Sequence, residues 1–433
     1  MAEAESVLTR FADARVLFAA ALAVRVAYLL TVGTQQAALF HPDSQLFVDL
    51  ALSPDWWRGH PERMPGYPIF LHFHFLIFGA DAFWAPVLSQ LAIDAFACVA
   101  IARTAEWVRP GTGRWAGVAA ALNPTQIVMA SVVLGDSIFM ACIAGGFLAM
   151  ARWWRRGKMP SDALAVGLWF GLALFNRAIV WPFVPVLATA MLAESRTLRP
   201  AAIAVAVIAV FAAPVVVQNW LLHGKPALSA QGGMHMALWW YPLARESADG
   251  TPFAKSAGEV ADEFARRGGR RDGSDWFGDE AIYAGIAREG LASVGPAGIA
   301  KAWTLGATIN LASPATLMIP HVMALPRTGF YATPGATPVE KVWNFVSGSS
   351  SAAYLGWLAG GIVLEWPVRL LAVAGLAVAL RRRELRAAGI FAVLWIGFVL
   401  AVQGPVASAK YRLLIEPLCA VLAAQLCRTR RAA

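Results

Sequence analysis

The sequence predicts an all-α membrane protein, a polytopic bundle in which about ten to twelve helices cross the bilayer. Three observations lead to this fold class. Hydrophobic residues make up 58% of the 433 residues and charged residues only 15%, whereas a soluble domain carries roughly 25% charged residues. The mean hydropathy is +0.56. Apolar runs close to the roughly 20 residues that cross a bilayer recur along the chain, separated by polar segments.

The net charge of +9 is informative through the placement of the cations. Lys and Arg near the ends of spans mark the cytoplasmic side, because short basic loops resist translocation. Cations that flank apolar runs stand at residues 10–15, 103–114, 152–158, 196–199, 381–386 and 428–431. Their spacing predicts cytoplasmic ends and leaves the other loops on one outer face. No basic stripe or recognition motif accompanies them, so we expect no nucleic-acid partner.

We expect one integral membrane domain over residues 1–433. Its spans are expected, in chain order, at residues 16–32, 83–101, 115–133, 137–153, 163–175, 180–192, 201–220, 352–380, 388–402 and 413–426. A first outer loop covers residues 34–81, with short interfacial helices, and a large hydrophilic outer loop covers residues 221–290. Residues 294–323 are apolar enough to enter the membrane, but a single crossing there would place the basic cluster at residues 381–383 outside. We therefore expect a re-entrant or interfacial segment there, or two short passes.

Asp43 follows the first span closely, so we expect it near the membrane interface. A partly desolvated carboxylate in that place can serve as a general base. A short polar residue can instead cap the helix expected over residues 44–52, and the spacing alone favours this structural role. Asp49 stands six residues on and roughly opposite on such a helix, where it either faces solvent or joins the same site.

The same loop continues with residues 63–68, which read Arg-Met-Pro-Gly-Tyr-Pro. Prolines on both sides of Gly-Tyr predict a stiff turn just before an apolar helix. Arg63 would then stand at the membrane surface, where a guanidinium binds a phosphate through paired hydrogen bonds. The alternative is an interfacial anchor in which Trp56, Trp57 and Tyr67 form an aromatic belt.

Further charged residues stand at turns that open on the same face. Asp136 begins the fourth expected span, where a carboxylate is costly unless it is hydrated, paired or used as a helix cap. Arg177 poses the same problem with the opposite charge and needs a partner, either a carboxylate such as Asp136 or an anionic ligand. Lys410 and Arg412 place two cations in the last outer turn, against the charge rule. They suit a lipid phosphate, or they snorkel to lipid headgroups.

Signatures of several common enzyme classes are absent, since the sequence has no Gly-rich nucleotide loop, no H-E-x-x-H and no G-x-S-x-G. Four histidines stand close together in the sequence, His41, His60, His72 and His74. His72 and His74 are two residues apart and do not share a helix face. We therefore assign no metal ligands and leave a divalent metal cofactor open.

Taken in order, these segments resemble the motifs of GT-C glycosyltransferases, above all the bacterial aminoarabinose, galacturonic acid and protein mannosyl transferases. Residues 63–68 are similar to an R-x-P-G-Y-P signature, and residues 411–417 (Tyr-Arg-Leu-Leu-Ile-Glu-Pro) to a closing R-Y-x-x-P-x-x-P helix. The motifs between or beside them are Pro42-Asp43-Ser44, Leu122-Asn123-Pro124, Gly135-Asp136, Asn176-Arg177 and Gln218-Asn219. The resemblance covers about residues 10–427. It departs from the group at Gly135-Asp136, where Thr-Glu is common, and at Leu414, where a proline is common.

The resemblance implies a GT-C-like bundle, a sugar donor carried on a polyprenyl phosphate and an inverting hexosyl or pentosyl transfer. It places the reaction on the periplasmic face of a bacterial inner membrane, with a glycan, lipid or protein as acceptor. The implied catalytic residues are Asp43, as general base, and Asp136; the implied substrate-binding residues are Arg63, Tyr67, Arg177, Lys410 and Arg412. We expect this chain to lack the large soluble C-terminal domain of the group, and we therefore expect the loop of residues 221–290 to help recognise the acceptor.

Two other functions suit a polytopic chain. A lipid-linked sugar flippase, or another transporter, would show internal repeats with broken helices paired across two halves, and no such repeat is visible. A structural subunit of an envelope complex would not need Asp43 and Arg63 in one loop.

Overall fold

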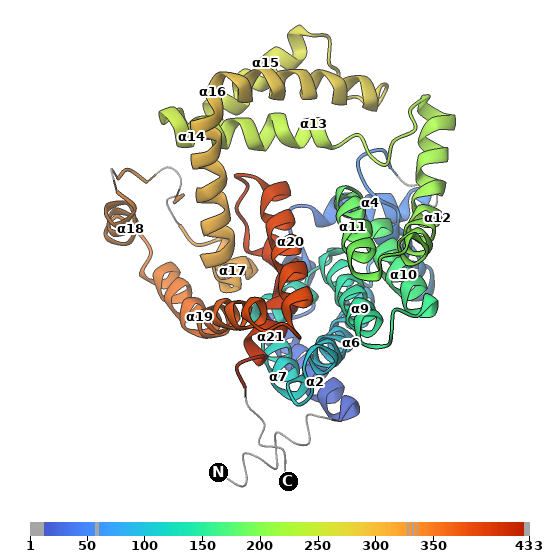
Figure 1. The fold of residues 1–433 in the computed structure, drawn as a ribbon. Coiled ribbons are helices and arrows are strands. Elements are labelled where there is room, and N and C mark those ends of the chain that lie inside the picture. The colour runs from blue at the N-terminus through green and yellow to red at the C-terminus, as the bar shows by residue number, and fades with distance from the viewer. Residues whose placement is uncertain (1–12, 57–59, 327–328, 331–332, 336, 428–433) are drawn as a thin grey trace, which may run out of the picture.

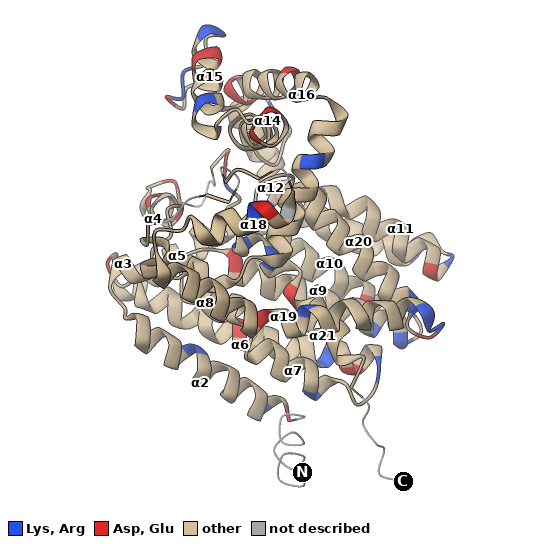
Figure 2. Ribbon diagram, turned by 90° about the vertical axis from the view of Figure 1, so that its left-hand side faces the viewer, with Lys and Arg blue, Asp and Glu red and all other residues tan. Residues whose placement is uncertain are grey.

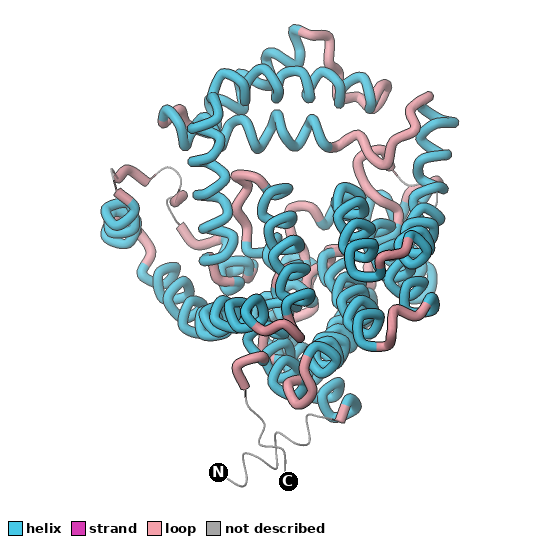
Figure 3. The backbone as a smooth tube through the Cα atoms, viewed as in Figure 1, coloured by secondary structure: helices cyan, strands magenta, loops and turns pink. Residues whose placement is uncertain are grey.

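The structure is a computed structural model that describes residues 13–56, 60–326, 329–330, 333–335 and 337–427. Within these ranges the regular elements are helices, apart from one isolated bridge between His60 and Arg63, and Figure 3 shows helices joined by loops. The predicted all-α class is confirmed. The flanking cations at Arg10, Arg428, Arg430 and Arg431, and the belt residue Trp57, lie outside the described residues.

Seven helical segments in the described part of the chain are long and apolar enough to cross a membrane. They are α2 (Ala14–Val32), α6 (Trp84–Val108), α9 (Asp136–Arg155), the 3-10 helix η2 with α11 (Ala178–Ser195), α12 (Leu198–His223), α19 (Ala352–Arg381) and α20 (Arg386–Gln403). Each overlaps an expected span. Their apolar side chains pack into one large core cluster, and the remaining apolar faces are exposed where lipid would surround the bundle.

The other expected spans are shorter or interrupted helices. These are α10 (Pro160–Asn176), α7 (Gly113–Ala121) with α8 (Pro124–Ala130), and the 3-10 helix η5 (Ala409–Leu414) with α21 (Glu416–Ala424). The break before α8 has a local cause: Pro124 cannot donate a helix hydrogen bond, and the Asn123 side chain caps the new helix by accepting from the Gln126 amide at 3.1 Å. The expected span over residues 115–133 is therefore two helices rather than one.

The first outer loop, residues 34–81, is largely helical. It contains α3 (Gln36–Leu39), α4 (Ser44–Leu52) and α5 (Gly66–Phe78), so short helices form in this loop as predicted. α5 is an apolar helix of 13 residues, and Phe73, Leu76 and Ile77 on it are exposed. The helix is too short to span a bilayer of ordinary thickness.

The large hydrophilic segment after α12 folds into a layer of helices over the bundle (Figure 1). It contains α13 (Gly232–His235), a π-helix (Met236–Trp240), α14 (Tyr241–Asp249), α15 (Phe253–Arg266) and the first half of α16 (Trp276–Ala312). We call residues 232–294 the helical cap. The cap has its own apolar core, in which Val260 and Phe264 of α15 pack against Tyr283 and Ile286 of α16. Charged residues cluster on the outside of α15 and α16 (Figure 2).

α16 changes direction at Gly295 and connects the cap to the bundle. Gly295 has φ 75° and ψ 165°, a conformation that is open essentially to glycine, and Pro296 follows it. The second half of the helix then descends toward the bundle (Figure 1) and ends at Ala312. Two short helices follow, η4 (Ala315–Met318) and α17 (Pro320–Met323), so residues 294–323 contribute one long helix half and two helical turns. The amphipathic α18 (Pro338–Ser347) precedes α19.

Because α19 packs closely against α21, we expect alanine substitutions at two glycines of α19 to differ sharply in their effect on stability. A Cβ on Gly375 would collide with the Leu422 carbonyl, whereas a Cβ on Gly360 meets nothing within 4 Å. We expect Gly375→Ala to destabilise the protein by about 1–3 kcal/mol, because overpacking forces the two helices apart. Gly360→Ala is the matched control. It should leave the midpoint of thermal unfolding unchanged or raise it slightly, since alanine favours a helix. Thermal unfolding in detergent measures both; equal midpoints for the two variants would contradict this packing.

Candidate active site

Asp43 forms an ion pair with a residue from the opposite end of the chain. The Lys410 ammonium donates to Asp43 Oδ2 at 2.8 Å. Asp43 stands at the N-cap position of α4, yet its side chain makes no cap hydrogen bond. The turn is closed instead by Ser44, whose hydroxyl accepts from the His41 amide at 2.8 Å. Capping, which the spacing alone favours, is therefore not what the Asp43 carboxylate does.

The Asp43 carboxylate is ionised at neutral pH and remains accessible. Burial by itself would raise its pKa, but the Lys410 ammonium, with smaller contributions from His41 and Arg63, brings the pKa below its ordinary value. The Asp43 side chain is 44% exposed, whereas the Lys410 side chain is 11% exposed. The site thus presents a charged carboxylate to solvent and holds the ammonium behind it.

His41 lies against this pair as a neutral ring. Its Nδ1 accepts from the Asp43 amide at 3.2 Å, which leaves Nε2 to carry the proton. Burial and the Lys410 cation lower the pKa of His41, outweighing the attraction of Asp43 and Asp136. A histidine that is uncharged at pH 7 adds no cation to the site but can still orient the backbone of residues 41–43.

Asp136 and Arg177 form the second ion pair of the site. The Arg177 guanidinium donates to Asp136 Oδ2 at 2.5 Å, and its carbon lies 6.0 Å from the centre of the Phe139 ring. Asp136 begins α9 and Arg177 follows α10, so the pair joins two helices at one end. The charges of both residues also act on the pKa of His41. Of the two partners expected for Arg177, a carboxylate such as Asp136 or an anionic ligand, the structure shows the carboxylate.

Arg63 has no carboxylate partner among the residues that the structure describes. In the described ranges no ion pair is formed by this residue; its guanidinium donates to the Glu62 carbonyl at 3.1 Å and lies 5.9 Å from the centre of the Phe47 ring. Burial lowers the pKa of Arg63, although the charges of Glu62 and Asp43 act against this, and the cation of Arg177 adds to the lowering. A half-buried guanidinium among cations is costly unless an anion joins it.

Tyr67, predicted to bind substrate, is buried and packs between segments of the site. It is 1% exposed, and its hydroxyl donates to Gln90 Oε1 at 2.7 Å. Its ring packs against Gly135, where any Cβ would lie 2.9 Å from the tyrosine. The neighbouring Gly66 allows the same loop to approach Asn176, since a Cβ there would lie 3.0 Å from the amide side chain. The Pro-Gly-Tyr turn thereby brings the segments of Asp136 and Arg177 to the first outer loop.

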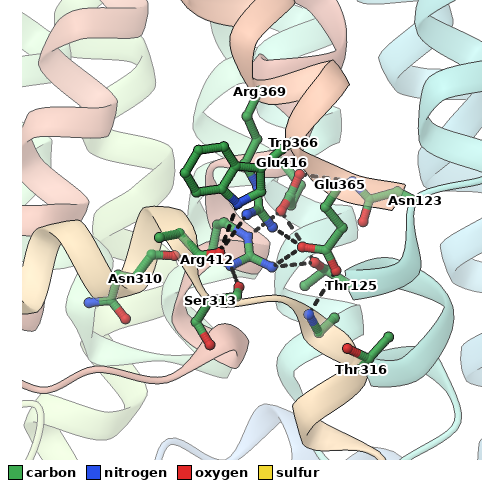
Figure 4. Close-up of polar contacts among 12 residues, drawn as sticks. Asn123, Thr125, Asn310, Ser313, Thr316, Glu365, Trp366, Arg369, Arg412 and Glu416 are labelled. Carbon is green, nitrogen blue, oxygen red and sulfur yellow. Dashed lines mark hydrogen bonds and ion pairs between the residues drawn. The ribbon is translucent and has the colours of Figure 1, made fainter. Parts of the chain in front are cut away.

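Arg412, also predicted to bind substrate, is buried in the bundle among protein partners. It is 1% exposed, and Figure 4 shows its guanidinium enclosed by polar groups. Glu416 Oε1 accepts from Nε at 2.5 Å and Glu365 Oε2 from Nη2 at 2.8 Å. The Asn310 carbonyl accepts from Nη1 at 3.0 Å, and the Thr125 hydroxyl from Nη2 at 2.8 Å. With these donors engaged, no face of the guanidinium is left for a phosphate.

The Arg412 cluster joins helices that are far apart in sequence. Glu365 also pairs with Arg369, one turn further along α19, and accepts from the Ala315 amide at 2.7 Å. Asn123 donates to Glu416 Oε2 at 2.8 Å. Two glutamates thus balance two arginines inside the bundle. Sequence reasoning missed Glu365 and Arg369, although charges inside an apolar run are a signal that they are paired or functional.

A second buried pair, also missed, lies between α2 and α6. The Arg25 side chain pairs with Asp94, and both are fully buried. Arg25 Nη1 also donates to the carbonyls of Ala21 and Ala121, at 3.0 and 3.1 Å. The Ala121 carbonyl ends α7, so the guanidinium satisfies the acceptor that the helix break exposes. This pair supports the break and lies outside the candidate site.

The helical cap contributes groups that face the site. The charges of Lys410 and Arg63 act on His235 of α13, and burial together with these cations lowers its pKa to about 4. His60 packs edge-on against Trp276, with ring centres 4.6 Å apart. Burial and Arg63 lower the pKa of His60, also to about 4. The cap is therefore close to the first outer loop, and the histidines on the two sides are neutral at pH 7.

No cluster of three or more metal-ligating side chains occurs among the described residues. The two histidines of α5 have other partners. His72 stacks on Trp56 with ring centres 3.9 Å apart and bonds to the Ala51 carbonyl at 2.8 Å. His74 bonds to Ser89 Oγ at 2.7 Å. Both rings thus contribute to packing of the loop.

No family model and no curated protein matches the sequence. Among solved structures, the chain is similar to the oligosaccharyltransferase AglB of Archaeoglobus fulgidus in complex with an inhibitory peptide and a dolichol-phosphate, with a TM-score of 0.46 and 14% identity over 95% of this chain and 50% of that one. It is also similar to the same enzyme tethered to an acceptor peptide, with a TM-score of 0.48, 13% identity and coverage of 95% and 49%. ArnT from Cupriavidus metallidurans gives a TM-score of 0.36 and 16% identity over 93% of this chain and 76% of that one.

The chain spans about half the length of the oligosaccharyltransferase that it resembles. At these scores the likeness concerns the fold, and the roles proposed below come from the residues of this chain.

The burial of the Arg412 cluster predicts unequal costs for two glutamates that make the same kind of contact. Glu416 pairs with Arg412 inside the bundle, and Glu263 pairs with Arg267 on the exposed face of α15, each across one helical turn. We expect Glu416→Gln to cost about 3–5 kcal/mol, because it leaves a buried arginine short of a counter-charge. Glu263→Gln should cost less than about 1 kcal/mol. Thermal unfolding of the two variants in detergent measures both losses of stability. Similar losses in the two variants would refute the structural role of Arg412.

Proposed function

We propose that the protein is an integral membrane glycosyltransferase of the GT-C type. It transfers a sugar from a polyprenyl-phosphate donor to a glycan, lipid or protein acceptor on the periplasmic face of a bacterial inner membrane. The observation that carries the proposal is the meeting of Asp43 and Lys410 beside Arg63 and Arg177. An accessible carboxylate and several cations thereby converge at loops that connect membrane helices.

The cations suit the leaving group of such a reaction. A polyprenyl tail lies in the bilayer, so its phosphate arrives at the membrane surface where these loops meet. Transfer breaks the bond between the anomeric carbon and the phosphate oxygen, and the electron pair stays on that oxygen. Charge that develops there is stabilised by cations already in place. Lys410 and the unpaired Arg63 are the candidate ligands, because Arg63 has no competing carboxylate among the described residues.

The carboxylate suits the acceptor. An acceptor hydroxyl attacks the anomeric carbon from the side opposite the phosphate, so the configuration inverts, and its proton passes to Asp43. A positioned base contributes about 10²–10⁴-fold to such a step. Asp43 is accessible enough for a hydroxyl to approach, and its ion pair with Lys410 aligns one oxygen. A phosphate bound to Lys410 would share that ammonium and leave the carboxylate freer to accept the proton.

The remaining predicted residues take supporting roles. Asp136 holds Arg177 at the edge of the site, where the outer face of the guanidinium can contact the phosphate or the acceptor. Tyr67 holds the turn before Asp136, and Arg412 anchors the segment that carries Lys410. We assign the approach of the acceptor to the side of the helical cap, where the charges of Lys410 and Arg63 act on His235.

Loss of the proposed base should abolish transfer without loss of the fold. We expect Asp43→Asn to lower kcat by about 10²–10⁴-fold, measured with purified protein, radiolabelled polyprenyl-phosphate sugars and a panel of acceptors. Asp49→Asn is the matched control, since Asp49 lies on the same short helix, and its only hydrogen bond among the described residues is with Gln45. If the wild type transfers no sugar, and reconstituted vesicles instead move the lipid-linked sugar across the bilayer, the protein is a flippase.

The Asp43–Lys410 pair also predicts the pH dependence of transfer. The lowered pKa of Asp43 keeps the base ionised, so kcat/KM should stay flat on the acid side and fall only as pH drops through that pKa. In Lys410→Met, the burial that raises the pKa of Asp43 loses its main opposing charge. The acid limb of kcat/KM should therefore move to higher pH, together with a loss of activity from the missing phosphate ligand. An acid limb at the same pH in both proteins would exclude Asp43 as the titrating base.

A further inference from the structure

The segment that leads into Lys410 is held by the second half of α16. Asn310 of α16 is 1% exposed, and both ends of its side-chain amide are used. Its Nδ2 donates to the Val406 carbonyl at 2.9 Å, and its Oδ1 accepts from the Ser408 amide at 2.8 Å. The two bonds bracket Ala407 and fix the backbone just before η5, in which Lys410 is the second residue.

Two glycines allow the helix and this segment to approach each other. A Cβ on Gly306, one helical turn before Asn310, would lie 2.6 Å from the Gly404 carbonyl. Gly404 itself has φ 62°, and a Cβ there would lie 2.9 Å from both Trp240 and Trp303. Trp303 also donates to the Ala401 carbonyl at 3.1 Å. The turn after α20 is thus enclosed by α16 on one side and by the π-helix of the cap on the other.

The same α16 is the continuation of the helical cap. Lys301, between the kink at Gly295 and the contact at Gly306, donates to the Ser247 carbonyl of α14 at 2.6 Å. The helix that carries Asn310 is thus bonded to the cap as well as to the turn after α20. Ser408, which Asn310 holds, is only two residues before Lys410. Its hydroxyl caps η5 and accepts from the Lys410 amide at 3.4 Å.

We propose that Asn310 is a positioning residue that sets the Lys410 ammonium against Asp43, and that α16 thereby couples the cap to the active site. The geometric part of this inference stands on the hydrogen bonds of Asn310 alone. Its catalytic meaning rests on the proposed function. Asn310 does not touch the proposed phosphate or acceptor; it acts through the backbone of residues 406–408.

The test uses the reactivity of Lys410, which needs no enzymatic activity. Full-length protein in detergent is treated with an amine-acetylating reagent, and mass spectrometry follows the rate at Lys410, with exposed Lys255 as internal reference. In Asn310→Ala we expect Lys410 to react several-fold faster, because its poorly exposed ammonium is released from Asp43, while Lys255 is unchanged. Asn310→Asp, which keeps the oxygen that accepts from Ser408, should give a smaller increase.

The matched control is Asn219→Ala. Asn219 is another buried asparagine, on the other helix that leads to the cap, and it donates to the Ala227 carbonyl at 2.7 Å. It should lower stability without changing the Lys410 rate. An unchanged Lys410 rate in Asn310→Ala, or an equal rise in Asn219→Ala, would overturn the inference.

Activity then separates this inference from the proposed function. If the wild type transfers sugar, the acid limb of kcat/KM in Asn310→Ala should move in the same direction as in Lys410→Met, and the double variant should show no further shift. A limb that stays in place would overturn the coupling. If the Lys410 rate responds as expected but no protein transfers sugar, the positioning role holds and the glycosyltransferase proposal fails.

Discussion

A buried arginine between two glutamates is the contact around which the C-terminal half of the bundle is built. Arg412 reaches Glu416 in the next turn, Glu365 on α19, and the carbonyl of Asn310 on α16. A charge inside a bundle is costly unless its partners are complete, so packing that separates Arg412 from these partners is disfavoured. Because an unpaired partner would be costly, the cluster favours one arrangement of these helices even where its net contribution to stability is small.

This cluster also decides what Lys410 can do. The two cations are two residues apart on a 3-10 helix, which turns once in about three residues, so they cannot share a direction. With Arg412 committed to the glutamates, Lys410 faces the first outer loop and meets Asp43. One segment thus supplies both the anchor of the fold and a cation of the candidate site. Asn310 belongs to both, since its carbonyl binds Arg412 and its side chain holds the backbone before Lys410.

The first outer loop is brought to the same place by close packing rather than by charge. Gly66 lets the loop lie directly against Asn176, and Gly135 makes room for Tyr67 of the loop, so that any larger residue at either glycine would push the segments apart. The carboxylate of Asp43 and the pair of Asp136 with Arg177 are consequently neighbours of one histidine, His41. The helical cap then closes over this group. The histidines on both sides are neutral, so the positive charge available to an anionic ligand comes from the arginines and the lysine.

The sequence by itself determined the all-α membrane class, most helix positions and the loops that contribute to the site. These follow from the spacing of apolar residues, the interruption of helices at prolines and the position of charged residues, which are properties of short segments. It also selected Asp43, Arg63, Tyr67, Asp136, Arg177, Lys410 and Arg412 as candidate site residues, each with a structural alternative. It could not decide whether Asp43 caps its helix, which of two neighbouring cations faces outward, or that residues 232–294 form helices with their own core. Those outcomes depend on Lys410, Glu365 and Asn310, which are distant in the chain from the groups that they contact. Only the tertiary structure shows which distant partner satisfies each buried charge, because a lone charge in an apolar run has many candidate partners and no local preference among them.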